Sequence, residues 1–205
     1  MPKKIVIVDY NMGNLASVAN ALDYIGYKAI ISNKVDDIKS ADYIILPGVG
    51  AFADGMKNLI DLGLVDVLKE QVLERKKPFL GLCLGMQLAA EKGYENGLTQ
   101  GLGFIKGKVK KFDIKNKDLR IPHIGWNEVY FKKNCILFDK LNKSEVFYFV
   151  HSYCLFPEED IVVGTFDYGG EFVAIIQKDN IFGTQFHPEK SQKAGLQILK
   201  NFIES

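Results

Sequence analysis

The stretch PFLGLCLGMQLAAEK, residues 78–92, decides how the chain folds. An apolar run at residues 79–82 predicts a buried strand, and the residues after Cys83 predict a helix that begins at once. Cys83 stands between Gly81 and Gly85. This Gly-x-Cys-x-Gly pattern is typical of a nucleophile elbow, a sharp strand-to-helix turn in which small flanking residues avoid a steric clash. The stretch therefore predicts a strand–cysteine–helix unit within an α/β sheet.

Cys83 has two interpretations at this point. Unpaired N–H groups and the dipole at a helix N-terminus favour a thiolate and, later, an oxyanion. A single cysteine in an apolar run is, however, usually a buried and inert core residue. The two flanking glycines favour a reactive cysteine over an inert one.

Strand and helix patterns alternate through the N-terminal half. Ile5–Val8 is a continuous β-branched run, which is typical of a central parallel strand covered on both faces. Further strands are predicted at residues 28–31 and 43–46, and helices at 15–25 and 56–77. Parallel strands joined by right-handed crossovers build a doubly wound sheet. The expected fold class is therefore α/β, with an open, mostly parallel, flavodoxin-like sheet.

The C-terminal half is rich in strands, which we expect to extend the sheet in antiparallel orientation. Short β patterns occur at residues 105–112, 128–131, 147–150, 161–166, 172–177 and 181–185. Residues 192–203 place apolar side chains on one face of a terminal helix. No linker-like stretch interrupts the 205 residues, so residues 1–205 are expected to form a single domain.

Composition and charge narrow the classes of function. Lys and Arg (26) balance Asp and Glu (25), so the net charge of +1 gives no long-range attraction to nucleic acid or to an anionic membrane. No window reaches the ~18 apolar residues of a membrane span. The first apolar run lacks a cleavage site and is interpreted as a strand, not a signal peptide. Three widely spaced cysteines do not suggest a disulfide framework, which favours a reducing cytoplasm.

A cysteine nucleophile needs a base, and the base needs a group that orients it. The candidates are His123, His151 and His187. His187 is the strongest because it follows a predicted strand and precedes Glu189, which can accept from one ring nitrogen and leave the other facing a thiolate. The alternative is an incidental salt bridge at a strand end. A metal site is disfavoured because the His and Cys residues lack the close spacing of zinc ligands.

The loop PGVGAF, residues 47–52, follows a predicted strand. In open α/β sheets the ligand site lies at the carboxyl ends of the strands, so we expect this loop and the elbow to share a crevice. Its glycines allow backbone N–H groups to approach an oxyanion, together with the N–H of Leu84. By itself, a Pro-Gly pair after a strand is more often a simple turn.

Several motifs together resemble a known family. GLCLGMQ with Cys83, HPEK with His187 and Glu189, and the PGVG loop are similar to those of class I glutamine amidotransferases. More narrowly, PHIGWNE (122–128), FYFVHSY (147–153) and the DYNMGN turn resemble the glutaminase subunits of imidazole glycerol phosphate synthases. The resemblance runs the full length, with the motifs in the same order.

The resemblance implies that Cys83 attacks the side-chain amide of L-glutamine, while His187, oriented by Glu189, protonates the departing ammonia and then activates water. The intermediate would be a glutamyl thioester, and no cofactor or metal is implied. Glutamine would be held by Gly50, Gln87, Glu95, Ser152 and Tyr153. The oxyanion hole would use the backbone of Gly48, Val49, Gly50 and Leu84.

The resemblance also implies a partner. Ammonia that escapes into neutral water is mostly protonated, so the family passes it through a dry channel to a (β/α)₈ cyclase subunit, which makes imidazole glycerol phosphate. The implied assembly is a heterodimer without nucleic acid or membrane. Residues in motifs that line the family's interface are Asn11, Asn14, Pro122, His123, Trp126 and Tyr148.

Other functions remain open from the sequence. Ile124 stands where the family usually has methionine, and KSQKAG (190–195) replaces a more common variant. These differences suggest, as an alternative, a paralogue that feeds ammonia to a related barrel for sugar amidination. More distant alternatives are a stand-alone γ-glutamyl hydrolase and a silent binding subunit, although the intact triad disfavours the silent subunit. The basic stretch 106–120 is interpreted as a solvated hairpin.

Overall fold

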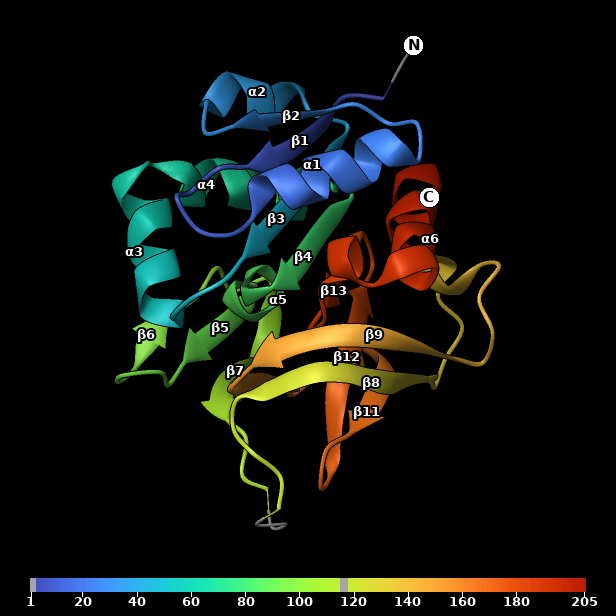
Figure 1. Cartoon of the computed structure of the whole chain (residues 1–205). Coiled ribbons are helices and arrows are strands. Elements are labelled where there is room, and N and C mark those ends of the chain that lie inside the picture. The colour runs from blue at the N-terminus through green and yellow to red at the C-terminus, as the bar shows by residue number, and fades with distance from the viewer. Residues whose placement is uncertain (1–2, 115–117) are drawn as a thin grey trace.

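The structure is a computed structural model that describes residues 3–114 and 118–205. Within these ranges, two sheets form the centre of the molecule (Figure 1). The larger sheet contains, in spatial order, β2 (Ala29–Ser32), β1 (Ile5–Val8), β3 (Tyr43–Gly48), β4 (Phe79–Cys83), β13 (Ile181–Thr184), β12 (Glu171–Lys178), β11 (Val162–Asp167), β8 (His123–Phe131) and β9 (Ser144–His151). The smaller sheet contains β10 (Tyr153–Pro157), β7 (Ile105–Lys111), β5 (Ala90–Gly93) and β6 (Thr99–Gln100).

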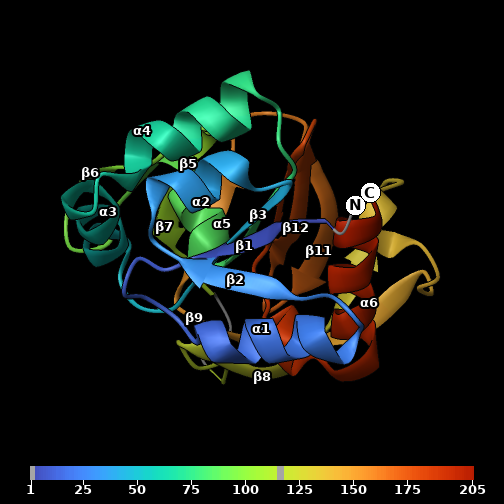
Figure 2. The ribbon, with the colours of Figure 1, turned by 90° about the horizontal axis from the view of Figure 1, so that it is seen from above.

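Helices cover both faces of the larger sheet. The α-helices are α1 (Leu15–Tyr24), α2 (Val35–Ser40), α3 (Phe52–Asp61), α4 (Leu64–Lys69), α5 (Leu84–Leu88) and α6 (Gln192–Glu204). A π-helical segment spans Glu70–Glu74, and 3₁₀ turns span Ile136–Phe138 and Pro188–Lys190. Figure 2 shows α1 and α6 on one face and the helices α2 to α5 on the other.

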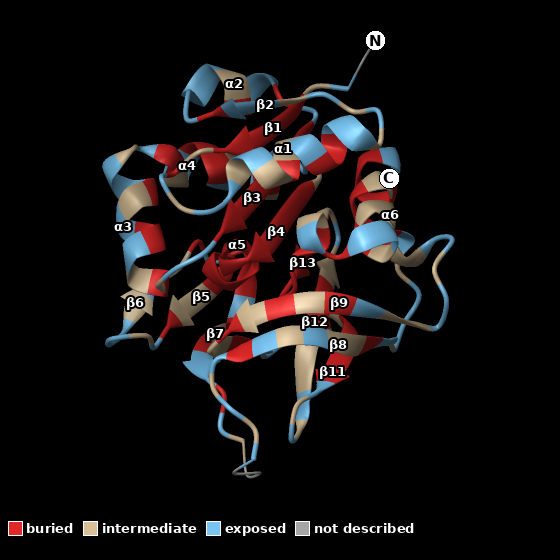
Figure 3. Ribbon diagram, in the orientation of Figure 1, coloured by how far each residue is buried: buried red, intermediate tan, exposed pale blue. Residues whose placement is uncertain are grey.

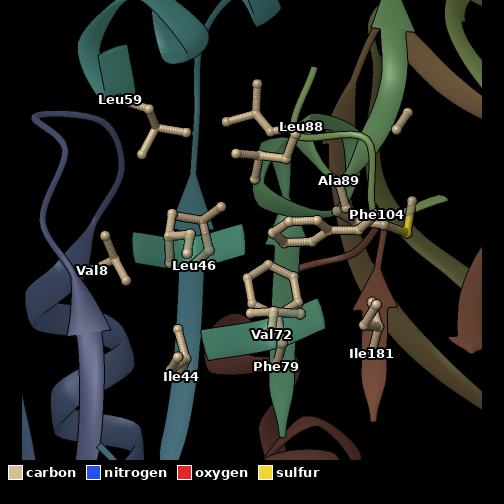
Figure 4. Close-up of a cluster of buried hydrophobic side chains, with 14 of the residues drawn as sticks. Val8, Ile44, Leu46, Leu59, Val72, Phe79, Leu88, Ala89, Phe104 and Ile181 are labelled. Atoms are coloured by element: carbon tan, nitrogen blue, oxygen red, sulfur yellow. The ribbon is translucent and has the colours of Figure 1, made fainter. Parts of the chain in front are cut away.

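The central strands are buried on both faces because their side chains alternate between two cores. In β1, Val6 and Val8 join a cluster with α2 to α5, whereas Ile5 and Ile7 join a second cluster with α1 and α6. Figure 4 shows the first cluster, with Leu59 of α3 above the sheet residues. This two-sided burial is the reason that these strands read as continuous apolar runs.

The strand directions place one edge of the sheet at the candidate site. Pairing is parallel from β2 through β13 and antiparallel from β13 through β9. Gly48 pairs with Cys83, and Thr184 pairs with Leu82, so three strands end together. The predicted α/β class with added antiparallel strands is confirmed.

Two predicted helices differ from the observed ones. The helical pattern at 56–77 is split, because Gly63 adopts a left-handed backbone (φ 67°) between α3 and α4. The helix that was predicted to begin directly after Cys83 is short and ends at Leu88. There the chain enters β5, whose residue Ala90 pairs with Ile105 of β7.

The smaller sheet was not expected. β7 pairs in parallel with β5 and antiparallel with β10, so the prediction of a hairpin over residues 106–120 is wrong for β7. Residues 115–117 of that stretch lie outside the described residues. The helix α2 and the strand β10 were also not predicted, because both are too short to show a clear period.

Burial differs sharply between the two ends of the larger sheet. Figure 3 shows β1, β3 and β4 as buried along their length, whereas β8 and β9 mix buried positions with intermediate and exposed ones. The outward positions include Ile124, Trp126 and Val146, which are 59%, 49% and 48% exposed. The β8–β9 pair therefore has one face in the core and one apolar face in solvent.

Candidate active site

Cys83 occupies a strained turn between β4 and α5. Its backbone angles are φ 51° and ψ −105°, which an L-residue rarely adopts. A Cβ atom on Gly85 would lie 1.7 Å from the carbonyl oxygen of Leu46, and one on Gly81 would lie 2.6 Å from the backbone nitrogen of Met86. Both flanking positions therefore require glycine, and the predicted elbow geometry is present.

His187 and Glu189 lie at the same sheet edge as Cys83, just after β13. The ring Nδ1 of His187 is 2.9 Å from Oε1 of Glu189, and both side chains are only 4% exposed. The backbone N–H of His187 donates to the Tyr148 carbonyl at 2.9 Å, which fixes the residue against β9. Among the described residues, His187 Nε2 has no hydrogen-bond partner. Since Nδ1 is held by Glu189, Nε2 is the nitrogen left for Cys83, whose side chain interacts with this imidazole, and for a reacting group.

Charged neighbours outweigh burial at His187. Burial lowers the pKa of a histidine, but the interactions with Cys83 and then with Glu189 together raise the pKa of His187 above its ordinary value of 6.5. The His187 imidazole is thus held in its protonated form between Cys83 and Glu189. With Nδ1 committed to Glu189, the exchangeable proton is the one on Nε2.

A cavity of about 420 Å³ opens beside Cys83. It is lined by Val49, Gly50, Ala51, Cys83, Leu84, Gln87, Glu95, Pro122, Val150, His151, Ser152 and Tyr153. All five residues that the resemblance assigns to glutamine binding are in this lining. A separate hollow of about 710 Å³, around residues 131–143, contains none of the candidate site residues.

Polar contacts hold the cavity walls together. Gln87, one helical turn after Cys83, donates from Nε2 to the Tyr153 carbonyl at 2.8 Å. Glu95 accepts through Oε2 from the backbone N–H of Phe52 at 2.8 Å, at the start of α3. Glu95 is therefore fixed to the residue that follows the PGVGA loop, and within the described part of the chain only Oε2 is engaged, which leaves Oε1 for a ligand.

The four oxyanion candidates lie around the elbow. Gly48 ends β3 beside Cys83, and Leu84 is the first residue of α5. Val49 is 41% exposed, and Gly50 has a left-handed backbone with φ 111°. Val49 and Gly50 line the cavity together with Leu84. The crevice shared by loop and elbow, expected from the strand ends, is thus observed.

The proposed interface residues do not form one uniform group. Asn11, Asn14, Pro122 and Trp126 are exposed, and Tyr148 is half-buried with its ring 5.8 Å from that of Trp126. His123 differs, because it is only 3% exposed and stacks on Tyr168 at 4.0 Å. In this structure His123 offers no surface to a partner.

Gln185 was not recognised from the sequence. It is fully buried, and its Nε2 lies 3.6 Å from the sulfur of Cys83. The available signal was a polar residue in the apolar run IFGTQF, two positions before His187. The Val150 carbonyl also contacts the thiol, at 3.9 Å.

Residues 3–114 and 118–205 hold no group of three His, Cys, Asp or Glu side chains arranged to bind a metal ion. Within the same ranges, no helix has the length and apolar character needed to cross a bilayer.

Comparisons with known proteins identify the family. The family described as Glutamine amidotransferase class-I matches residues 6–205. The imidazole glycerol phosphate synthase subunit HisH 1 of Campylobacter jejuni (strain RM1221) is 51% identical over 199 residues, covering 97% of this chain and 98% of that protein. HisH 2 of Vibrio vulnificus (strain YJ016) is 52% identical over 202 residues, covering 98% and 94%. HisH of Aquifex aeolicus (strain VF5) is 49% identical, covering 96% and 94%.

Solved structures share the fold at low sequence identity. PurLQS from Thermotoga maritima has a TM-score of 0.74 at 20% identity and covers all of this chain and 99% of that one. A glutamine amidotransferase from Thermotoga maritima has a TM-score of 0.66 at 16% identity, covering 100% and 82%. With a family match over nearly the whole length and relatives at about half identity, the chain belongs to the class I glutamine amidotransferases.

Proposed function

We propose that this protein is the glutaminase subunit of an imidazole glycerol phosphate synthase. The observation that carries the proposal is the convergence of Cys83, His187 and Glu189 beside a cavity lined by all five expected glutamine contacts. The near-half identity to HisH proteins over almost the full chain supports the same assignment.

The proposed reaction follows from the site geometry. The Cys83 thiolate attacks the side-chain amide carbonyl of L-glutamine, and the backbone around Val49 and Leu84 stabilises the resulting oxyanion. The C–N bond breaks as His187 Nε2 gives its proton to the leaving nitrogen, which releases ammonia and leaves a glutamyl thioester. His187 then removes a proton from water, the hydroxide attacks the thioester, and glutamate and the free thiol are formed. Glu189 holds the imidazole throughout.

The cavity can recognise glutamine through a charged side chain and through backbone groups. The second carboxylate oxygen of Glu95 suits the ammonium group of the substrate, and the Ser152 and Tyr153 backbone lines the same cavity. Gln87 and Gly50 complete the lining. The cysteines Cys83, Cys135 and Cys154 are all free, which suits the reducing cytoplasm proposed for this reaction.

Ammonia needs a partner to receive it. We assign this role to a (β/α)₈ cyclase that docks on the exposed Asn11, Asn14 and the cavity-lining Pro122, together with the apolar residues Ile124 and Trp126 on the outer face of β8. A half-exposed Trp on an otherwise open strand face is a suitable interface anchor. Docking there would form a heterodimer and keep ammonia away from bulk water.

A related acceptor is the second candidate. Ile124, which departs from the usual methionine, is 59% exposed on the outer face of β8, where a partner would contact it. A difference at that position favours a different barrel, such as one that amidinates a sugar. The glutaminase chemistry would be identical in both cases.

Glutamate formation tests the proposal. The purified chain should hydrolyse glutamine slowly alone and much faster with the cyclase of its own organism and the cyclase ligand. Cys83→Ala should abolish hydrolysis in the mixture, and Cys135→Ala, outside the cavity, should retain it. Rapid partner-independent turnover would contradict a coupled subunit, and activity in Cys83→Ala would refute the nucleophile. Stimulation only by a different barrel would favour the paralogue.

A further inference from the structure

We propose that a buried hydrogen-bond network joins β8 to the nucleophile Cys83, and that its buried members hold the glutamine cavity in its reactive geometry. The positioning residues that it adds to the site are His123, His151 and Gln185. The proposal rests on the glutaminase function proposed above, which it deepens. Two arms of the network meet at the backbone carbonyl of Tyr153, a cavity-lining group.

The histidine arm begins at Asn127 on β8. The Nδ2 atom of Asn127 is 2.8 Å from the carbonyl of Asp167 and 3.4 Å from Nε2 of His123. His123 and His151 are direct neighbours across β8 and β9, with His123 Nδ1 3.1 Å from His151 Nε2. His151 Nδ1 then lies 3.0 Å from the Tyr153 carbonyl oxygen.

These contacts fix the tautomer of each ring. A carbonyl oxygen only accepts hydrogen bonds, so the Nδ1 of His151 must carry a proton toward Tyr153. The Nε2 of a neutral His151 is then an acceptor, which requires a proton on Nδ1 of His123. The Nε2 of His123 in turn accepts from Asn127. Cys154 Sγ, 3.7 Å away, is a second and longer contact of His151 Nδ1, and this arrangement gives each ring nitrogen a complementary partner.

Both imidazoles are neutral at physiological pH. Burial lowers the pKa of His123 to about 4 and that of His151 to about 3. Aromatic rings enclose the pair, with Phe149, Phe166 and Tyr168 stacked on His123. A neutral pair in a fixed tautomer adds rigid hydrogen bonds to the site and no charge.

The glutamine arm leads from the same carbonyl to the sulfur. Gln87 Nε2 donates to the Tyr153 carbonyl at 2.8 Å and to Oε1 of Gln185 at 3.1 Å. Gln185 Nε2 then points at Cys83 Sγ from 3.6 Å. Flipping either amide would set donor against donor or acceptor against acceptor, so both orientations are determined.

The network has a chemical consequence at each end. The N–H donor of Gln185 stabilises an anionic sulfur and fixes its direction toward the substrate carbon. The Tyr153 carbonyl is held by two donors, so the wall that faces glutamine keeps its position. At the other end, Asn127 shares β8 with the exposed Trp126, which connects the network to the proposed docking face.

Histidine tautomers test the network without measuring activity. In ¹⁵N-histidine-labelled protein, the signals of His123 and His151 should report the Nδ1–H tautomer at pH 7. The variants His123→Asn and His151→Asn identify each signal by its loss. An Nε2–H tautomer at either ring would refute the network, even if the glutaminase proposal holds. Correct tautomers in a chain that does not hydrolyse glutamine would refute the proposed function instead.

Steady-state kinetics test the positioning roles. Gln185→Met removes the donor to sulfur at similar volume, and we expect kcat to fall about tenfold or more with little change in KM. His151→Phe removes the donor to Tyr153 and should raise KM for glutamine about tenfold. His151→Asn retains a donor near the Nδ1 position and should recover most of that loss. Equal changes in kcat and KM across all three variants, tracking their melting temperatures, would show a merely structural role and overturn the proposal.

Discussion

The stability of this protein should depend on pH through His151, and replacing that residue isolates the effect. His151 is 6% exposed, and burial lowers its pKa to about 3. Its folded-state pKa lies below the ordinary value of 6.5, so it contributes stability above pH 6.5 that is lost as the pH falls through 6.5 toward 3. We therefore expect wild type to lose more stability on acidification than His151→Asn.

The magnitude follows from proton uptake by the unfolded chain. Between pH 7.5 and 5.5, an unfolded histidine goes from about 9% to about 91% protonated, whereas folded His151 stays neutral. For the unfolded histidine, the proton-binding factor 1 + 10^(pKa − pH) is about 10 times larger at pH 5.5 than at pH 7.5. This ratio corresponds to about 1.4 kcal/mol of unfolding free energy. His187 is present in both proteins, but His123 contacts His151 directly, so the same comparison in a His123→Asn background separates its contribution.

Urea unfolding at both pH values provides the measurement. Acidification from pH 7.5 to 5.5 should lower the unfolding free energy of wild type by about 1.4 kcal/mol more than that of His151→Asn. As a control, equal m-values for the two proteins would show that the substitution leaves the unfolded state unchanged. Parallel pH dependence would mean that His151 takes up its proton normally in the folded chain, and the buried neutral pair would be wrong.

Three further predictions concern single positions. Gly85→Ala should cost about 3 kcal/mol or more in urea unfolding, because its Cβ would lie 1.7 Å from the Leu46 carbonyl, whereas Gly170→Ala should change stability by less than about 0.5 kcal/mol. Tyr10→Phe should be neutral or stabilising by up to about 1 kcal/mol, since the buried hydroxyl has no partner among the described residues; a clear loss would reveal one. Glu95→Gln should raise KM for glutamine about tenfold or more, and an unchanged KM would exclude Glu95 from ammonium binding.

Local pattern was sufficient for the parallel core and the elbow. The apolar runs at β1 and β4 are continuous because both faces of those strands are buried. Their burial can therefore be predicted directly from the sequence. The two glycines around Cys83 are equally direct, because the backbone of Leu46 and Met86 leaves no room for a Cβ at either position. The requirement at Gly81 comes from the turn itself, whereas that at Gly85 comes from Leu46 on the neighbouring strand β3, so the glycine pattern also records one tertiary contact.

Helix length and the smaller sheet required tertiary information. The apolar spacing through residues 56–77 is that of one helix, yet the left-handed Gly63 turns the chain between α3 and α4. After Leu88, the chain leaves α5 because Ala90 pairs with β7, a strand that begins fifteen residues later at Ile105. Pairing with a strand at that distance in the chain outweighs the local helical propensity.

The sequence by itself determined the reactive groups: a glycine-flanked cysteine, and a histidine followed two residues later by a glutamate, each a local pattern that follows a strand. Only the tertiary structure determined which polar side chains surround and position these reactive groups. Gln185 reaches Cys83, and His123 turns inward to His151, only because β4, β13, β8 and β9 are brought together by sheet pairing. The physical reason is that a side chain's chemistry is local, whereas its burial and hydrogen-bond partners depend on strands far away in the chain.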